Sequence, residues 1–215
     1  MLEVHSFEFN LFGVRTYLVW DTASLECAVI DPGMSNQREE SEFDRFIDEN
    51  RLKVTHLINT HLHIDHTLGN DYVESRFNLP LEANSGDAFL GQQRDGQARM
   101  FNLRLPSLKP LVIGVDLSEG DKIKLGEEYL EVLEVPGHSP GSIVLYAPVE
   151  HFMIAGDVLF QGSIGRTDLP GGSMRTLVEG IRSKLLPLPS DTIVYPGHGP
   201  ATTIGRERSS NPYFG

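Results

Sequence analysis

The sequence has 215 residues, a length typical of one globular domain with a sizeable core. Its formal net charge of −12 makes nucleic acid a poor partner, because an acidic surface repels phosphate backbones. A single cysteine, Cys27, excludes an intramolecular disulfide and a thiolate-rich zinc site, and its apolar neighbours favour a buried, unreactive thiol.

The N-terminus lacks the basic segment and the apolar core of a signal peptide. No apolar run approaches the roughly 20 residues that a membrane-spanning helix needs. We therefore expect a cytoplasmic protein without a membrane partner, folded as a single domain over residues 1–215. The sequence leaves the oligomeric state open.

The N-terminal part of the chain predicts a β-hairpin followed by alternating helices and strands. Two apolar runs, at residues 16–20 and 27–30, flank the turn-forming tetrapeptide Asp21-Thr22-Ala23-Ser24. Further along, the pattern predicts a helix over residues 41–50, a buried strand over 54–59, helical structure from 66 to 78 and a short helix near 86–91.

Residues 92–113 lack clear periodicity and contain prolines, so we expect a long excursion that is either a lid or a surface loop. The second half then returns to strands, at residues 122–125, 129–135, 143–146, 151–155 and 192–195. Its clearest helix spans residues 174–186, with Ser173 as the N-cap and Pro187 at the end. Strand groups separated by helices predict a layered α/β domain with more than one sheet.

Four of the apolar runs lead into a side chain that can bind a metal. These side chains are His61, His138, Asp157 and His198. Ligands at strand ends can converge along one edge of a sheet. Glycine precedes three of them, at Gly137, Gly156 and Gly197, which fits a turn that aims the next side chain; an ordinary strand-ending turn would favour glycine too.

The densest cluster of such side chains is the segment Thr60-His61-Leu62-His63-Ile64-Asp65-His66. Imidazole and carboxylate ligands suit zinc, iron or manganese. Four ligand-type residues within six positions cannot comfortably surround one ion from a continuous helix. A loop with the first two histidines, followed by a helix start with Asp65 and His66, can serve two neighbouring ions. The alternative is a polar loop with hydrogen-bonded histidines, which the density of the cluster disfavours.

The motif His-x-His-x-Asp-His, followed by Pro-Gly-His138, Gly-Asp157 and Pro-Gly-His198, resembles the metallo-β-lactamase superfamily. Order and spacing match from Asp31-Pro32-Gly33 to His198. The resemblance implies an α/β fold of four layers, an αβ/βα sandwich. In this sandwich two mixed sheets face each other, helices lie outside, and metals bind at one sheet edge.

The resemblance also implies a role for each matching residue. His61, His63 and His138 would hold a first metal, Asp65, His66 and His198 a second, and Asp157 would bridge them. We expect two divalent ions, with zinc as the first choice and iron or manganese as alternatives. The ions would activate a water to hydroxide, which attacks a carbonyl, and Asp65 and Asp157 would be the catalytic carboxylates.

The substrate class follows from finer resemblances. Asp157 argues against a typical β-lactamase, which carries cysteine or serine there, and His63 argues against the diiron flavoprotein branch. The segment from Gly156 to Asp168 resembles the glyoxalase II group, so we expect a small-molecule thioester such as S-lactoylglutathione. An iron-dependent persulfide dioxygenase, an ester or lactone hydrolase, and a non-catalytic metal-binding protein remain as alternatives.

Several charged or titratable residues outside this set have more ordinary interpretations. Arg166 and Asp168 either brace the loop at the active site or form a surface ion pair. His5, His56 and His151 match no motif position, so we expect them to be structural.

The thiol carrier stays open. Full-length glyoxalase II enzymes grip glutathione with basic residues of a C-terminal helical domain. Here only Arg206 and Arg208 offer positive charge after His198. The arginines that could substitute for that grip are Arg94, Arg99 and Arg104, in the stretch 92–113.

Overall fold

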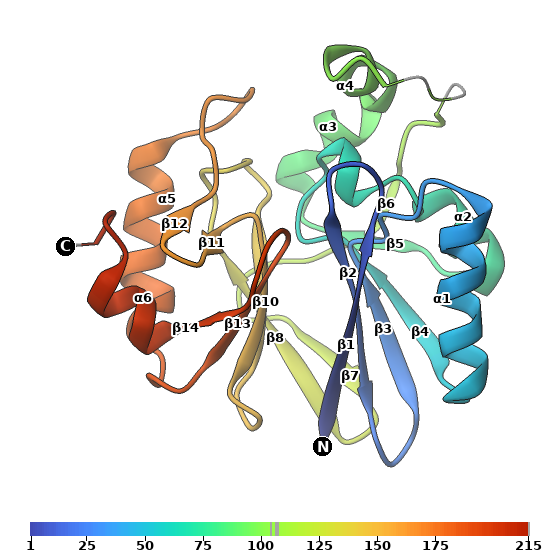
Figure 1. The fold of residues 1–215 in the computed structure, drawn as a ribbon, viewed down its shortest axis with the longest axis horizontal. Coiled ribbons are helices and arrows are strands. Elements are labelled where there is room, and N and C mark those ends of the chain that lie inside the picture. The colour runs from blue at the N-terminus through green and yellow to red at the C-terminus, as the bar shows by residue number, and fades with distance from the viewer. Residues whose placement is uncertain (104, 106–107, 215) are drawn as a thin grey trace.

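Two six-stranded sheets face each other in the computed structural model, which describes residues 1–103, 105 and 108–214. The first sheet has the order β1-β2-β3-β4-β5-β6, and the second has the order β14-β13-β10-β9-β8-β7. Helices cover the outer faces, so the layers run helix, sheet, sheet, helix (Figure 1). Both sheets mix parallel and antiparallel pairs, which confirms the predicted αβ/βα sandwich.

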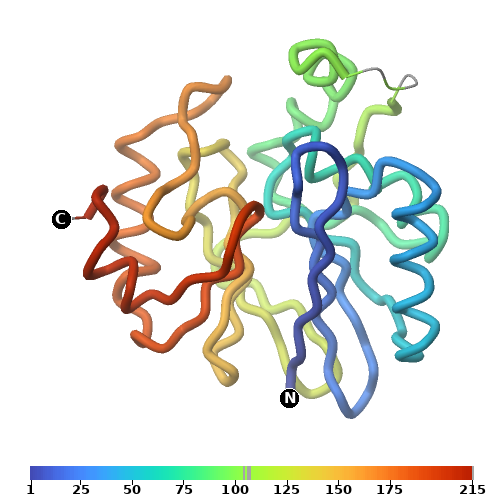
Figure 2. The backbone as a smooth tube through the Cα atoms, viewed as in Figure 1, coloured from blue at the N-terminus to red at the C-terminus, as the bar shows by residue number. Residues whose placement is uncertain are grey.

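Each half of the chain builds one sheet, as Figure 2 shows by the change from blue and green to yellow and red. The strands of the first sheet are β1 (Leu2–Phe9), β2 (Val14–Asp21), β3 (Glu26–Ile30), β4 (Lys53–Ile58), β5 (Leu81–Ala83) and β6 (Ile113–Asp116). Those of the second are β7 (Lys122–Leu125), β8 (Glu128–Glu134), β9 (Ile143–Ala147), β10 (Phe152–Gly156), β13 (Ile193–Pro196) and β14 (Thr202–Thr203). A small separate ribbon pairs β11 (Leu159–Phe160) with β12 (Ser163–Ile164).

The helices are short. They are α1 (Gln37–Glu49), α2 (Asn70–Phe77), α3 (Ala88–Gln92), α4 (Arg94–Met100), α5 (Met174–Gly180) and α6 (Ile204–Ser210). Single 3₁₀ turns lie at Ile64–His66 and Ser85–Asp87, and a π-helical turn at Ile181–Leu185 extends α5. Ser173 caps α5 as predicted, since its side chain accepts the backbone N–H of Thr176.

Strand β2 shows how one strand serves two layers, because its side chains alternate between the faces of the sheet. Leu18 packs on the outer side in one cluster with Phe43 and Ile47 of α1. Tyr17 and Val19 point inward and pack against the second sheet. A third cluster lies between the second sheet and helices α5 and α6. Three apolar clusters therefore hold the four layers together.

Strand direction brings distant parts of the sequence to one edge of the sandwich. β13 pairs in parallel with β10. β8 and β10 both pair antiparallel with β9, so β8 also runs parallel to β10. The carboxyl ends of β8, β10 and β13 therefore lie at the same edge of the second sheet. The loops that carry His138, Asp157 and His198 begin there.

Several elements were not predicted, among them β5, β6, β14 and α6, and two of the differences bear on the site. β1 was not predicted as a strand, but it pairs with β2 along its whole length, from Leu2 opposite Asp21 to Phe9 opposite Val14. Residues 94–100 form helix α4 instead of an irregular excursion, despite Gly96 in its middle. Tertiary contacts, described below for the buried side chains of α4, stabilise a helix that local propensity disfavours.

Helix α1 begins four residues earlier than the predicted range, at Gln37, because Asn36 caps it. The Asn36 side chain accepts the backbone N–H groups of Arg38 and Glu39, both at 3.1 Å. We expect Asn36→Ala to lower the free energy of unfolding by about 1 kcal/mol. Urea unfolding measures this loss. Asn36→Asp retains the acceptor and serves as the control, so equal losses in both variants would contradict the capping role.

Cys27 is buried in the outer cluster of the first sheet, and burial raises the pKa of its thiol. This environment agrees with the unreactive thiol that the sequence predicts. Among the helices of the described residues, none has the length and apolar character that a membrane span requires.

Candidate metal centre

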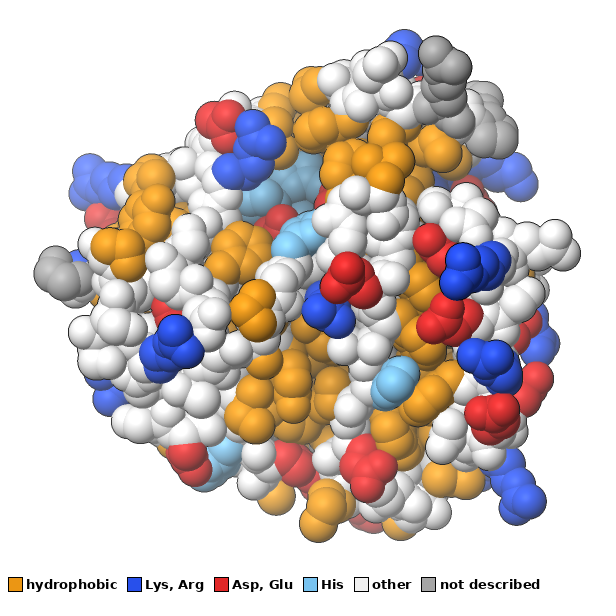
Figure 3. All heavy atoms as spheres, viewed as in Figure 1, with side chains coloured by type: hydrophobic (Ala, Val, Ile, Leu, Met, Phe, Trp, Pro, Cys, Tyr) orange, Lys and Arg blue, Asp and Glu red, His pale blue; other side chains and the backbone are white. Residues whose placement is uncertain are grey.

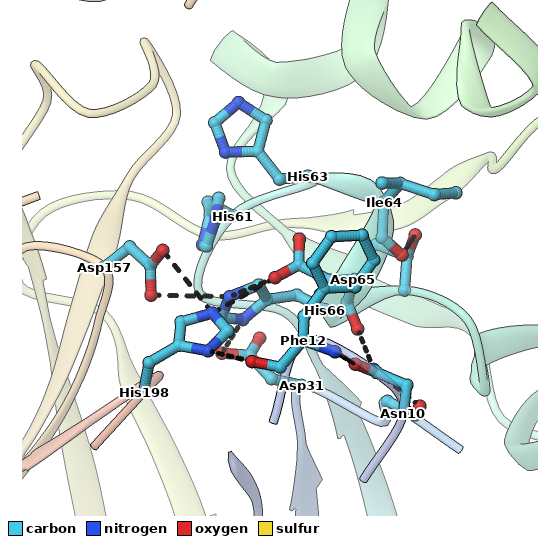
Figure 4. A network of polar contacts seen from close by, with 12 residues as sticks. Asn10, Phe12, Asp31, His61, His63, Ile64, Asp65, His66, Asp157 and His198 are labelled. Atoms are coloured by element: carbon cyan, nitrogen blue, oxygen red, sulfur yellow. Dashed lines mark hydrogen bonds and ion pairs between the residues drawn. The ribbon is translucent and has the colours of Figure 1, made fainter. Parts of the chain in front are cut away.

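The ligand-type side chains predicted from the sequence meet where loops leave both sheets. Figure 4 labels all of them except His138. His61 follows β4 of the first sheet, and the loop and 3₁₀ turn after it carry His63, Asp65 and His66. His138, Asp157 and His198 follow β8, β10 and β13 of the second sheet. Three trios of close ligand atoms lie here among the described residues, and two of them, together with ion-type contacts of Asp157, connect all seven. The third trio is Asp31, His61 and His66.

The first trio consists of three imidazoles whose nitrogen atoms lie within 4.8 Å of one another. His138 Nε2 lies 2.8 Å from His63 Nδ1 and 3.2 Å from His61 Nε2. All three side chains are buried. Three ring nitrogens directed at one point form a cradle for a tetrahedral metal that keeps its fourth position open.

Hydrogen bonds on the far side of two rings fix which nitrogen faces the cradle. His138 Nδ1 donates to the backbone carbonyl of Arg166 at 2.8 Å. His61 Nδ1 lies 3.2 Å from the Thr60 hydroxyl, which already donates its own proton to a carboxylate and so accepts here. Both neutral rings therefore direct an Nε2 lone pair inward. Two facing lone pairs form no hydrogen bond, but a cation between them satisfies both.

The second trio joins a carboxylate to two imidazoles. Asp65 Oδ2 lies 3.1 Å from His198 Nε2 and 3.7 Å from His66 Nε2. On their outer sides, His198 Nδ1 donates to the carbonyl of Phe12 at 3.2 Å, and His66 Nδ1 donates to Asp31 at 3.0 Å. Again the Nε2 atoms face inward, held by an outer oxygen acceptor as is usual for metal-binding histidines.

Asp157 lies between the two trios. Its Oδ1 lies 3.4 Å from His66 Nε2. Its Oδ2 lies 3.7 Å from His138 Nε2 and 3.8 Å from His198 Nε2. One carboxylate therefore reaches ligand atoms of both groups, which is the arrangement that a bridge between two ions requires.

Burial and neighbouring charges shift the pKa values of these groups. Burial lowers the pKa of His61 well below its ordinary value and, with repulsion between the rings, lowers that of His63 to about 3. For Asp65 and Asp157 burial opposes ionisation, but the rings of His66 and His198 together outweigh it, so both pKa values are lowered. The same carboxylates raise the pKa of His198 and raise that of His66 well above its ordinary value, against the effect of burial. Neutral imidazoles and ionised carboxylates are the forms that bind metals, so a metal that binds here displaces the protons favoured on His66 and His198.

Unpaired buried atoms give an independent test of whether a metal fits. His66 Nε2 and Asp157 Oδ1 are buried and form no hydrogen bond among the described residues. Burying such groups without a partner is costly. Both point into the same cluster, and a divalent cation would satisfy both. The donor set and these two atoms therefore fit a metal centre.

Asp31 supports the second trio from behind, and the sequence analysis did not single it out as a site residue. Its carboxylate accepts the Thr60 N–H at 2.7 Å, the Thr60 hydroxyl at 2.6 Å and His66 Nδ1–H at 3.0 Å. It is fully buried, with a φ of 52°. The available signal was Asp31-Pro32-Gly33 directly after β3, where the match to the superfamily begins, but no role was assigned to Asp31.

Asp87 ties the two loops of the first trio together and was also missed. Its Oδ2 accepts the N–H of Leu62 at 3.0 Å and the hydroxyl of Ser139 at 2.7 Å. Its Oδ1 accepts the N–H of Gly141 at 2.6 Å. Leu62 lies between His61 and His63, so this one buried carboxylate sets the distance between the loop of those histidines and the loop of His138.

We expect Asp87→Asn to weaken zinc binding about 10- to 100-fold, the usual effect of changing a group that orients metal ligands. The amide keeps the shape but replaces one acceptor oxygen with a donor, so one of the two loops loses its contact. Competition with a chelating dye measures the affinity. Asp116→Asn is the control, because its exposed carboxylate also accepts a backbone N–H. Equal affinities in the two variants would exclude the proposed role of Asp87.

Two glycines make the close approach of the sheets possible at this point. Gly156 has a φ of +47°, and a Cβ there would lie 2.3 Å from the Thr60 hydroxyl oxygen. A Cβ on Gly197 would lie 2.3 Å from Asp157 Oδ1 and 2.7 Å from His66 Cε1. The predicted need for glycine before Asp157 and His198 therefore has a specific steric cause.

The Arg166–Asp168 pair combines both of its predicted interpretations. The two side chains form a bidentate ion pair at 2.7 and 2.8 Å and are more than half exposed, as in a surface pair. The loop nevertheless braces the centre through its backbone, since the Arg166 carbonyl orients His138.

Of the arginines in the stretch 92–113, the two that the structure describes do not line the cavities at the centre. Arg94 is buried, pairs with Asp71 at 2.9 Å and donates to the carbonyl of Thr67 at 2.6 Å. Its guanidinium therefore binds other residues of the fold and does not face a ligand. Arg99 lies in the exposed last turn of α4 and lines neither cavity at the site. Arg104 lies outside the described residues.

The remaining histidines make contacts outside the centre. His5 stacks on Phe46 with ring centroids 3.9 Å apart. His56 bonds Glu82 at 2.7 Å, and His151 pairs with an exposed aspartate at 3.2 Å. These contacts agree with the structural roles predicted for all three.

Comparison with known proteins agrees with the geometry. The family model of the metallo-β-lactamase superfamily matches residues 10–198. Hydroxyacylglutathione hydrolase GloC of Haemophilus influenzae is 38% identical, over 92% of this chain and 91% of its own length. The crystal structure of the B3 metallo-β-lactamase BLEG-1 superposes with a TM-score of 0.88 at 31% identity, covering 99% of both chains. TTHA1623 in a di-iron-bound form superposes with a TM-score of 0.84 at 33% identity, covering 97% and 99%.

Proposed function

The chain belongs to the metallo-β-lactamase superfamily, and from that premise we propose that it is a two-metal hydrolase of thioesters. The observation that carries this proposal is the position of Asp157, whose two oxygens reach both ligand trios. A site for one ion would need only one trio. Family membership makes metal-dependent hydrolysis the general activity, and the thioester substrate is the specific proposal.

In this proposal each trio holds one ion. His61, His63 and His138 hold the first, Asp65, His66 and His198 hold the second, and Asp157 bridges them. Zinc suits this nitrogen and carboxylate set, and iron is the alternative, since the similar TTHA1623 was solved with two irons. When bound, the ions supply a water of lowered pKa and polarise the substrate carbonyl.

The chain's own residues then position the reactants. Asp65 and Asp157 line the cavity of about 190 Å³ over the centre, and their side chains are 16% and 15% exposed. Asp65 can accept a hydrogen bond from the attacking water and hold its remaining lone pair toward the carbonyl carbon. Phe12 and Phe101 line the same cavity and limit the access of bulk water.

A thioester is the preferred substrate for two reasons. The relative GloC carries the name of a hydrolase of hydroxyacylglutathione, which is a thioester. Asp157 also occupies the position where a typical β-lactamase is expected to carry cysteine or serine. Because the chain is similar to BLEG-1, hydrolysis of a cephalosporin must be tested alongside thioesters. An ester and a lactone test the remaining hydrolase alternatives.

An iron-dependent persulfide dioxygenase is the second candidate function. It would use His61, His138 and Asp157 around one iron. His138 Nε2 lies 3.2 Å from His61 Nε2 and 3.7 Å from Asp157 Oδ2, so these three side chains form a compact group. The complete second trio is the argument for the hydrolase instead, since a single-iron site leaves it without a function.

The test uses full-length protein reconstituted with zinc, iron or manganese. We expect hydrolysis of S-lactoylglutathione or of another thioester, detected by thiol release, and little turnover of a cephalosporin. Oxygen uptake with glutathione persulfide and no thiol release from any thioester would support the dioxygenase. Inactivity toward every thioester with all three metals would refute the proposal.

A further inference from the structure

A second cavity opens beside the metal centre. Its volume is about 230 Å³, and its walls come from α3, α4 and the loop around residues 169–170. It shares His63, Phe101 and Leu169 with the cavity over the metals, so the two spaces adjoin. A substrate with its carbonyl at the centre can therefore extend a group into the second cavity.

The walls of this second cavity are apolar. Its lining residues are His63, Phe89, Leu90, Gln93, Gly96, Gln97, Met100, Phe101, Leu169 and Pro170. None of these described residues carries a fixed charge. The amide of Gln97 is already used, because it accepts the N–H of Ile64 at 3.0 Å and donates to the carbonyls of Leu62 and Leu90. Among the described residues that line this cavity, a carboxylate or phosphate of a ligand would find no cation.

The mouth of the cavity exposes apolar side chains to solvent. Met100 is 61% exposed and Phe89 is 37% exposed. Phe101 meets Phe12 of the β1–β2 loop edge to face, with ring centroids 5.8 Å apart. Figure 3 shows histidine side chains in a hollow between the two halves of the molecule, with hydrophobic side chains around it. Apolar side chains gathered at the rim of a reactive centre indicate a binding surface.

We propose that this cavity binds an uncharged, apolar chain of the substrate, next to the bond that is cleaved. The inference rests on the proposed hydrolase function and names the class of its substrate. At roughly 30 Å³ for each water-sized group, 230 Å³ accommodates about six to eight carbon atoms. The proposed preference is for medium-chain, uncharged thioesters over thioesters of glutathione, whose carboxylates this cavity cannot pair.

Gly96 gives a way to fill the cavity without changing the metal centre. It lies in the middle of α4, and a Cβ there would meet only the Cβ of Gln93, at 3.9 Å. Gly96→Ala therefore adds a single methyl group without strain and serves as the control. Gly96→Leu adds three more carbon atoms that extend into the space proposed for the chain.

The experiment measures kcat/KM in two series of thioesters. One lengthens the acyl group from acetyl to hexanoyl on N-acetylcysteamine, and the other lengthens an alkyl thiol on an acetyl group. In at least one series we expect about a fourfold gain per methylene, or on the order of 10² from the shortest to the longest substrate. The series that shows the gain identifies which side of the substrate occupies the cavity.

Gly96→Leu should lose most of that gain, so that its kcat/KM rises little from the shortest to the longest thioester. Gly96→Ala should keep the gain. Equal kcat/KM across both series would overturn the inference. So would a higher value for S-lactoylglutathione than for the longest thioester of the series that shows the gain.

A binding measurement separates this inference from the proposed function. Hexanamide is uncharged and can be titrated by calorimetry against the metal-loaded protein, with acetamide as the short reference. Tighter binding of hexanamide, lost in Gly96→Leu, supports the cavity assignment even if no thioester is hydrolysed. Equal binding of both amides would overturn it, whatever reaction the centre catalyses.

Discussion

Asp157→Ala is expected to lower kcat/KM for thioester hydrolysis by about 10³ or more and to leave at most one tightly bound metal ion per chain. The alanine removes the one carboxylate that reaches both trios. A metal that polarises a carbonyl contributes several kcal/mol to transition-state stabilisation. Each 1.36 kcal/mol corresponds to a factor of ten in rate, which gives the expected magnitude.

Steady-state kinetics and metal analysis of the same samples test this expectation. Asp191→Ala is the matched control, because it removes a carboxylate that is 74% exposed and remote from the ligand trios. A variant Asp157→Ala that keeps two metals and more than a tenth of the wild-type rate would show that Asp157 is not the bridge.

Asp31→Asn should produce the second-largest effect, on folding as well as on metal binding. The Asp31 carboxylate accepts hydrogen bonds from both donors of Thr60 and from His66 Nδ1, all inside the fold. In Asp31→Asn the amide N–H groups replace one acceptor oxygen, so at least one of these donors would face another donor. Leaving buried donors unpaired costs about 1–3 kcal/mol. Loss of the His66 contact should weaken metal binding by about 10- to 100-fold.

The backbone should not contribute to this loss, because asparagine tolerates the left-handed conformation that Asp31 adopts at a φ of 52°. Urea unfolding in the presence of a chelator isolates the folding effect, and zinc competition measures the binding effect. If Asp31→Asn matches wild type in both measurements, the carboxylate does not position His66.

The sequence alone singled out the side chains of the two trios and Asp157 as candidate ligands because metal chemistry favours certain residue types at certain spacings. Positions 61, 63, 65 and 66 carry histidine or aspartate, and the remaining candidates each come after an apolar strand. The sandwich was predicted through the same motif. Position 197 requires glycine because a Cβ there would collide with the Asp157 carboxylate.

What the sequence did not predict depends on contacts between distant segments. Asp31 lies 35 positions from His66, and Asp87 lies 52 positions from Ser139, so neither pairing leaves a local pattern. Helix α4 was missed because the segment lacks clear periodicity, contains Gly96 and is followed by prolines, while contacts such as the Arg94–Asp71 pair leave no local pattern. The apolar cavity beside the centre exists only because α4 adopts that helix.

A count of metal ions per chain tests the central claim most directly. Native mass spectrometry of the intact protein, after addition of zinc and removal of loosely bound ions, gives this number. Two trios joined by Asp157 predict two zinc ions per chain in wild type. A protein that binds no ion, or only one, under these conditions would contradict the two-metal centre.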